Sequence, residues 1–204
     1  RLDQDQVAEA VSVGSWDSLQ PEMLAMTLDN NVRRRFAWPV RALHWTSAVL
    51  VLVAYLTTEL AEDAKHGEAV GINWHVAAGL ALVLLFLPRL LAKLLPQPGP
   101  LLPPAPRWSV LSSRLVMLAL LLFVVVQPVL GILMVWAEGE ALAIPFTAWS
   151  LPPPAWAPGE GAGDALEEAH ELIGNAFHAV IGLHALAALW HQFVRRDGTL
   201  RRML

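Results

Sequence analysis

Four histidines on three long apolar segments are the side chains of this sequence best suited to chemistry. His170 and His184 are fourteen residues apart on a predicted helix, so they share one face and differ in height by about 21 Å. His44 and His75 lie near the starts of two other apolar segments. Because the interior of a membrane offers an imidazole no polar partner, four such residues need a common explanation. Paired axial ligation of two haem irons provides one.

Membrane-spanning helices must position these histidines. The chain has 204 residues, of which 55% are hydrophobic, and its mean hydropathy is +0.47. A span needs about twenty apolar residues. The stretch 141–150 is too short to cross. We therefore expect an all-α membrane protein with a four-helix bundle over 36–204, preceded by a cytoplasmic tail over 1–35. The four predicted spans are 41–60, 73–95, 110–136 and 170–194.

The charged residues predict how the bundle is oriented. Basic side chains gather before the first span, around the second connection and after the fourth span, and the positive-inside rule makes these regions cytoplasmic. The other two connections are acidic, with Lys65 as their one basic residue. Both termini are therefore predicted to be cytoplasmic, and the acidic loops to face outward. The basic residues are Arg33, Arg34, Arg35, Arg41, Arg89, Lys93, Arg107, Arg114, Arg195, Arg196, Arg201 and Arg202, and the acidic ones are Glu59, Glu62, Asp63, Glu68, Glu138, Glu140, Glu160, Asp164, Glu167 and Glu168.

This orientation predicts which histidines pair. His75 and His170 both begin inward-running helices, at the outer surface, whereas His44 begins an outward-running helix near the inner surface. The rise of about 21 Å along the fourth span carries His184 toward the level of His44. The predicted pairs are therefore His75 with His170, and His44 with His184. His191 shares the face of His184 and matches the depth of His44 better, so helical geometry alone leaves these two as alternatives.

Glycines and arginines near the histidines suit a haem. Gly79 and Gly174 each follow a histidine by four residues, so each leaves a gap on the ligand's face for a flat macrocycle. Close helix packing is the alternative reading of both glycines. Arg41 and Arg114, together with Arg89, are candidates to pair with haem propionates at the inner side, although topology alone also explains these charges. The sequence has no cysteine, which excludes covalent c-type attachment and thiolate iron–sulfur ligation.

Several motifs resemble the bacterial cytochrome b561 family over about residues 36–204. They are RALHW at 41–45, His75 with Gly79, HE at 170–171, GLHA at 182–185 and RDGTLRRM at 196–203. The resemblance implies a multi-pass inner-membrane protein that binds two haem b groups non-covalently, with His44, His75, His170 and His184 as axial ligands. It thereby favours His184 over His191. Family members carry electrons between an outer donor and membrane quinone, and one branch oxidises superoxide and reduces ubiquinone, which implies a quinone-linked oxidoreductase.

The acidic outer loops bear on the electron donor. Superoxide is an anion and is captured faster by a positive entrance, whereas an acidic face steers a basic redox protein such as a small c-type cytochrome. Exclusion of basic residues by topology is the alternative explanation of these charges. We expect no nucleic-acid partner.

Two alternative functions remain open. The first is a cytochrome b subunit of a larger dehydrogenase or hydrogenase complex. The second is a histidine-lined metal transporter or assembly protein. The height difference of about 21 Å between His170 and His184 disfavours the second, because ligands of one ion must converge within a few ångströms.

Overall fold

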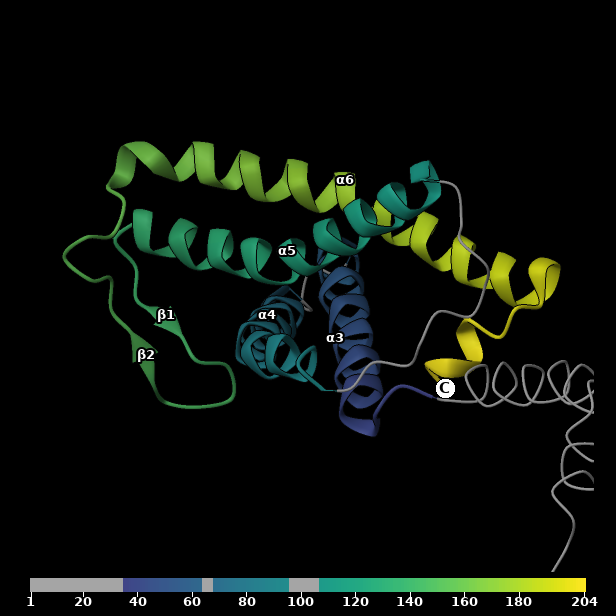
Figure 1. The fold of residues 1–204 in the computed structure, drawn as a ribbon. Coiled ribbons are helices and arrows are strands. Elements are labelled where there is room, and N and C mark those ends of the chain that lie inside the picture. The colour runs from purple at the N-terminus through teal and green to yellow at the C-terminus, as the bar shows by residue number, and fades with distance from the viewer. Residues whose placement is uncertain (1–34, 64–67, 96–106) are drawn as a thin grey trace, which may run out of the picture.

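The computed structural model describes residues 35–63, 68–95 and 107–204, and four long helices dominate this part of the chain (Figure 1). They are α3 (Trp38–Asp63), α4 (Glu68–Ala92), α5 (Arg107–Ala137) and α6 (Gly163–Trp190). All four are long and apolar enough to cross a membrane. This confirms the predicted four-helix membrane fold. The predicted tail lies outside the described residues except for Arg35.

Each helix begins a few residues before the apolar run that predicted it. The difference is largest for α6, which begins at Gly163, seven residues before the predicted start at His170. The acidic Asp164 stands in its first turn, where a negative charge is stabilised by the helix dipole. A prediction based on apolar residues omits such polar first turns, because they lie outside the hydrocarbon core of the membrane.

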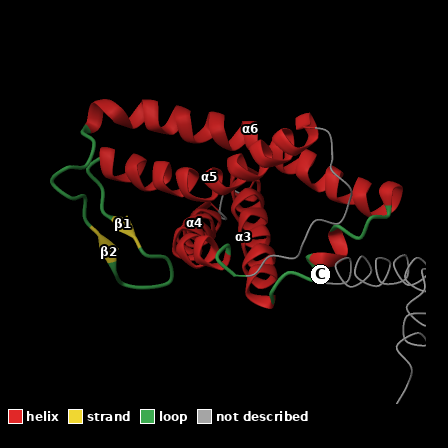
Figure 2. Ribbon diagram, viewed as in Figure 1, coloured by secondary structure: helices red, strands yellow, loops and turns green. Residues whose placement is uncertain are grey.

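The helices associate in two pairs (Figure 1). Helix α3 packs along α4 and α5 packs along α6, while α4 also contacts α5. Between α5 and α6, two short strands, β1 (Leu142–Ala143) and β2 (Ser150–Leu151), pair antiparallel with Leu142 opposite Leu151 (Figure 2). The 3₁₀ turn η1 (Glu160–Ala162) then leads into α6. The stretch 141–150, predicted as too short to span, thus belongs to this hairpin.

The bundle has an apolar exterior. Its buried side chains are few, and include Leu82, Phe123 and Val124. Large apolar side chains instead point outward, with Leu84 76% exposed and Trp149 78% exposed. A surface of this kind is costly in water and is matched by lipid.

The C-terminal end of the described chain folds back onto the beginning of α3. After α6 come a π-helical turn, η2 (His191–Arg195), and a 3₁₀ turn, η3 (Leu200–Arg202). The indole N–H of Trp45 donates to the Met203 carbonyl at 2.7 Å, and the Phe36 N–H donates to the Arg202 carbonyl at 3.0 Å. Residues 36 and 203 therefore lie at the same end of the bundle.

Candidate functional site

His75 on α4 and His170 on α6 face each other. Their ring centroids are 6.1 Å apart and their planes are inclined by 71°. Imidazole nitrogens bind transition metals at about 2.0–2.1 Å, so two rings on opposite sides of one ion have centroids about 6 Å apart once the ring radii are included. The observed separation of 6.1 Å is close to the value expected for two axial ligands of a single metal ion.

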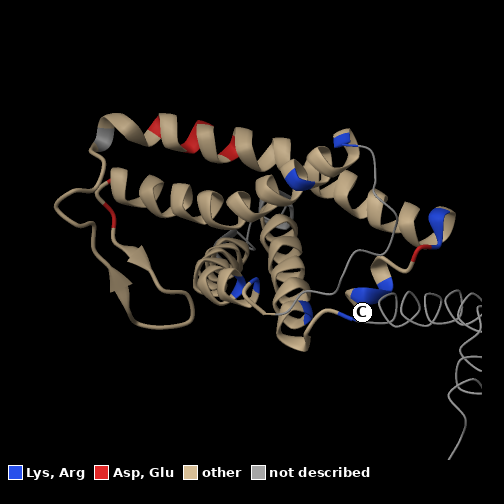
Figure 3. Ribbon diagram, viewed as in Figure 1, with Lys and Arg blue, Asp and Glu red and all other residues tan. Residues whose placement is uncertain are grey.

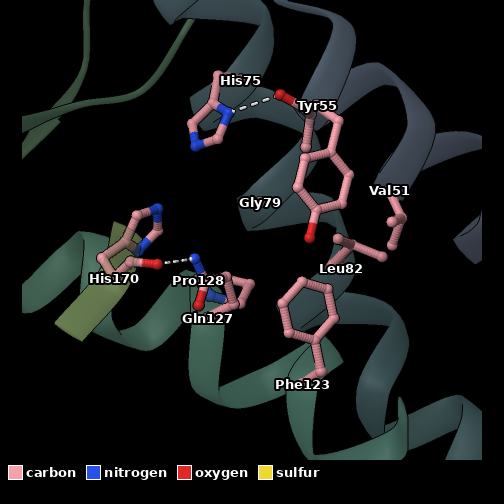
Figure 4. Close-up of a pocket in the computed structure, with 10 residues that line it drawn as sticks. Val51, Tyr55, His75, Gly79, Leu82, Phe123, Gln127, Pro128 and His170 are labelled. Atoms are coloured by element: carbon pink, nitrogen blue, oxygen red, sulfur yellow. Dashed lines mark hydrogen bonds between the residues drawn. The ribbon is translucent and has the colours of Figure 1, made fainter. Parts of the chain in front are cut away.

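The hydrogen bonding of His75 prepares its ring for a metal. The Nδ1 atom lies 2.9 Å from the backbone carbonyl oxygen of Ala54, drawn as a dashed line in Figure 4. A carbonyl only accepts, so Nδ1 carries the proton and donates it. The Nε2 lone pair is then left for a ligand, which is the arrangement that metal-binding histidines usually have.

Apolar cavities flank this outer pair on two sides. One, of about 450 Å³, extends toward the middle of the bundle and is shown in Figure 4. The other, of about 610 Å³, extends toward the hairpin and reaches Leu142. Both are bordered by the two histidines, Gly79 and Pro128. A macrocycle centred between the two rings would need open space on both sides of them. The first cavity is lined by Val51, Ala54, Tyr55, His75, Gly79, Leu82, Phe123, Gln127, Pro128 and His170.

Three glycines near the outer pair have different neighbours. A Cβ atom at Gly79 would lie 3.6 Å from the Pro128 Cβ, at the border of both cavities, where the prediction put a gap. A Cβ at Gly131 would lie only 3.3 Å from Cε1 of His170, so this glycine makes room for the ring. Gly174 has another neighbour: its Cβ would lie 3.1 Å from Nε2 of Gln127. Its predicted contact with haem stays a prediction.

A second histidine pair lies further along the bundle. His44 on α3 and His184 on α6 have ring centroids 6.3 Å apart, with planes inclined by 67°. A cavity of about 780 Å³ adjoins this inner pair. Phe123 and Val51 border both this cavity and the 450 Å³ cavity of the outer pair. These two side chains therefore lie between the two histidine pairs.

Cations accompany the inner pair. Arg89 and Lys93 line its cavity, and the Arg89 guanidinium lies 3.5 Å from Nδ1 of His44 and 3.3 Å from the Leu43 carbonyl oxygen. The Nε atom of Arg41 is buried and has no hydrogen-bond partner among the described residues. Arg114 is exposed and is not among the residues that line this cavity. The propionate role of Arg41 and Arg114 stays a prediction.

His184 and His191 have different neighbours in the structure. His184 faces His44, whereas Nδ1 of His191 lies 2.5 Å from Oδ2 of Asp197. The Asp197 side chain is only 4% exposed and also accepts hydrogen bonds from the hydroxyl and the N–H of Thr199. Burial opposes its ionisation, but the bonds from Thr199 and His191 outweigh burial and hold the pKa of Asp197 below its ordinary value.

Three side chains that surround the outer pair were not predicted from the sequence as residues of a haem site: Tyr55, Phe123 and Gln127. The Tyr55 hydroxyl donates to the Gly174 carbonyl at 2.7 Å, and its ring lies against His178 with centroids 4.1 Å apart. Phe123 stacks on Phe177 with centroids 4.0 Å apart. Tyr55 is the sole tyrosine of the chain and Gln127 a single amide in an apolar run. These two isolated polar residues were the only signals in the sequence that could have pointed to Tyr55 and Gln127.

Donor atoms for a bare metal ion do not gather elsewhere in the described residues. Within 35–63, 68–95 and 107–204, no three His, Asp or Glu side chains come together as a metal site. The histidines that converge do so as two separate pairs. Two protein donors at each site suit a metal whose remaining ligands come from a macrocycle.

Comparisons with known proteins agree with this arrangement. Residues 35–204 match the family model described as prokaryotic cytochrome b561. The chain is 32% identical to the probable superoxide oxidase CybB of Yersinia pestis, over 79% of this chain and 91% of that protein. It is 27% identical to cytochrome b561 homolog 1 of Escherichia coli K12, over 83% and 97%. It is 33% identical to cytochrome b562 of Cereibacter sphaeroides, over 79% and 90%.

The family match covers all four helices and both histidine pairs. Membership in a cytochrome b family implies b-type haem, and the apolar exterior of the four helices fits a multi-pass protein of the inner membrane. The chain therefore belongs to the prokaryotic cytochrome b561 family and is a membrane electron-transfer protein.

Proposed function

We propose that this protein passes electrons through two b-type haems, held by His75 with His170 and by His44 with His184, between an outer donor and the membrane quinone pool. The observation that carries the proposal is the spacing of the two pairs, 6.1 and 6.3 Å between ring centroids. Haem with histidine on both axial positions has no open coordination site, so it supplies one-electron transfer rather than oxygen binding.

The residues between the pairs favour transfer without an aqueous path. Phe123 is 6% exposed and borders the cavities of both pairs, together with Val51. Tyr55 lies parallel to Phe123, with centroids 6.4 Å apart. Apolar side chains between two haems would hinder the passage of water and protons while leaving electron transfer possible.

Exposed carboxylates at the hairpin end support a basic redox protein as the donor. Figure 3 shows the acidic residues of α6 and of the segment after α5 at this end, whereas most basic residues lie toward the other end. By the positive-inside rule the acidic end faces outward. Opposite charge raises the encounter rate of a cationic partner. The exposed acidic residues are Glu138, Glu140, Asp164, Glu167, Glu168 and Glu171.

Superoxide is the second candidate donor, because a relative that is 32% identical is named a probable superoxide oxidase. The two donors differ in charge, and their rates therefore respond oppositely to salt. Added salt slows the reaction of a cationic protein with an acidic face, whereas it relieves the repulsion of an anion. Rates measured from low to high ionic strength with each donor separate the two possibilities.

His191 supports quinone reduction at the inner end. Its side chain is 31% exposed, it begins η2 seven residues after His184, and its Nδ1 is held by Asp197. Reduction of a quinone to a quinol takes up protons as well as electrons. A histidine anchored by a carboxylate can hydrogen-bond a quinone carbonyl and deliver a proton to it.

The first experiment is a reduced-minus-oxidised spectrum of the purified protein, with extracted haem measured per polypeptide. We expect two b-type haems, and the loss of one of them in His75→Ala and likewise in His184→Ala. His178→Ala is the matched control, because His178 lies on the same helix as His184 but contacts Tyr55 instead of another histidine. Absence of haem, or equal haem loss in the control, contradicts the proposal. Purification in a stable complex with a soluble dehydrogenase would instead favour a subunit role.

A further inference from the structure

Gln127 is a polar side chain at a site where a membrane helix ordinarily carries an apolar one. It lies within α5, is partly buried, and directly precedes Pro128. A buried carboxamide is costly unless its N–H groups and its oxygen are hydrogen-bonded. Its surroundings therefore indicate what it does.

One end of the carboxamide contacts His170. Its Nε2 donates to the backbone carbonyl oxygen of His170 at 2.7 Å (Figure 4). Gly174, one turn further along α6, permits this approach, because a Cβ there would lie 3.1 Å from Nε2. Gly174 on α6 thus leaves room for the Gln127 side chain of α5. It fixes the α6 backbone at the residue that carries the imidazole.

The other end of the carboxamide lacks a partner, and so does the imidazole beside it. Among the described residues, three buried side-chain N or O atoms make no hydrogen bond, and two of them are Oε1 of Gln127 and Nδ1 of His170. The first is an acceptor. The second becomes an N–H donor once Nε2 binds a metal. His75 differs, since its Nδ1 already has the Ala54 carbonyl.

The packing of the His170 ring brings it to the same face of α5 as Gln127. Gly131 is four residues after Gln127 on that helix, and a Cβ at Gly131 would lie 3.3 Å from Cε1 and 3.7 Å from Nδ1 of His170. Residues four apart on a helix lie on one face. The unpartnered nitrogen and the unpartnered oxygen therefore lie near the same face of α5, and in this structure they are not hydrogen-bonded to each other.

We propose that Gln127 is a positioning residue for the outer haem: its Nε2 holds the His170 backbone, and its Oε1 turns to accept a hydrogen bond from His170 Nδ1–H when that histidine binds iron. The inference rests on the proposed ligation of haem by His75 and His170. A hydrogen-bond acceptor at Nδ1 makes an imidazole a stronger electron donor to the metal. Ferric iron is stabilised relative to ferrous iron, so Gln127 holds the reduction potential of the outer haem down.

The test is a potentiometric titration of both haems in Gln127→Leu, Gln127→Glu and the control Val126→Leu, which alters a partly exposed neighbour on α5. In Gln127→Leu we expect the reduced-to-oxidised ratio of the outer haem, at fixed potential, to rise about three- to tenfold, as loss of one hydrogen bond predicts. Gln127→Glu keeps an acceptor oxygen and restores a ratio at or below that of the parent protein. The inner haem is unchanged throughout. Recovery in Gln127→Glu, which keeps an acceptor oxygen but cannot donate to the His170 carbonyl, is the result that a purely structural role would not produce.

A second variant covers the case in which Gln127→Leu loses the outer haem entirely. Gly174→Ala crowds Nε2 without changing the carboxamide, and should raise the same ratio to a smaller extent. Equal shifts in both haems, or no shift in the outer haem of either variant, would overturn the role of Gln127. The proposed ligation is tested separately: if His170→Ala retains both haems, that proposal fails whatever the Gln127 variants do.

Discussion

The hydroxyl of Tyr55 on α3 donates a 2.7 Å hydrogen bond to the carbonyl of Gly174 on α6, and this contact joins the two helix pairs. In the packing of the helices, α3 lies mainly against α4, and α6 mainly against α5. The bond falls four residues after His170, beside the cavity of the outer pair. This side chain therefore links α3 and α6, the two helices that carry His44 and His184.

Tyr55→Phe should lower the thermal stability of the bundle while keeping its ring packing. The variant retains the ring that stacks parallel to Phe123 and removes the hydroxyl alone. A side-chain hydrogen bond in a membrane protein contributes about 0.6–1.5 kcal/mol, which corresponds to a fall in melting temperature of about 1–6 °C for a domain of this size. Melting followed by circular dichroism in detergent measures it. Thr57→Ser, which keeps a hydroxyl that bonds only within α3, is the control.

Gly131→Ala should cost the outer haem, because the added methyl group would lie 3.3 Å from Cε1 of His170 and the ring cannot retreat without leaving His75. Gly182→Ala is a matched control on α6, since a Cβ at Gly182 meets no atom within 4 Å. We expect haem content to fall toward one per polypeptide in the first variant and to stay unchanged in the second. Full haem content with unaltered spectra in Gly131→Ala would contradict the tight packing of this ring.

The fold and the histidine pairing could be predicted from the sequence for different reasons. Four apolar runs of span length left little choice of architecture, and the structure confirms the four helices. The pairing of His75 with His170 followed from helical rise and alternating direction, and these rings do face each other. Both inferences use properties of single helices, namely the length of an apolar run and the rise per residue. These properties do not depend on which other helices lie beside them.

The supporting contacts were not predictable in this way. Gln127 and Tyr55 each reach a backbone carbonyl on another helix, at His170 and Gly174. Which carbonyl a single polar side chain meets depends on how the two helices are rotated about their own axes. The sequence does not determine this rotation, because the faces of each helix are similarly apolar. The different neighbours of His184 and His191 also could not be predicted, because Asp197 approaches His191 only after the chain reverses at Arg196, where φ is 52°.

Asp197 should make stability depend on pH in the acidic range. Its pKa is lowered in the folded protein, so folding favours its ionised form. Its contribution to stability is complete above the ordinary aspartate pKa of about 3.9 and is lost as pH falls through the lower folded-state value. Melting temperatures measured from pH 6 down to pH 2 should fall in this range in the parent protein. In Asp197→Asn the fall should be shallower and the plateau lower. Parallel curves for the two proteins would show that Asp197 does not contribute.

Neutralising the acidic end should slow a basic donor selectively. In the double variant Glu167→Gln and Glu168→Gln, both side chains are exposed near the start of α6, so the fold should be unaffected. We expect the rate of electron transfer from a reduced basic cytochrome c to fall severalfold at low ionic strength and to lose much of its salt dependence, because steering by surface charge acts within about a Debye length. A neutral quinol serves as the control, since its rate does not depend on surface charge.

If superoxide is the physiological donor, the same variant should react with it faster, because two negative charges no longer repel the anion. An unchanged rate with the basic cytochrome would assign these carboxylates to membrane topology alone.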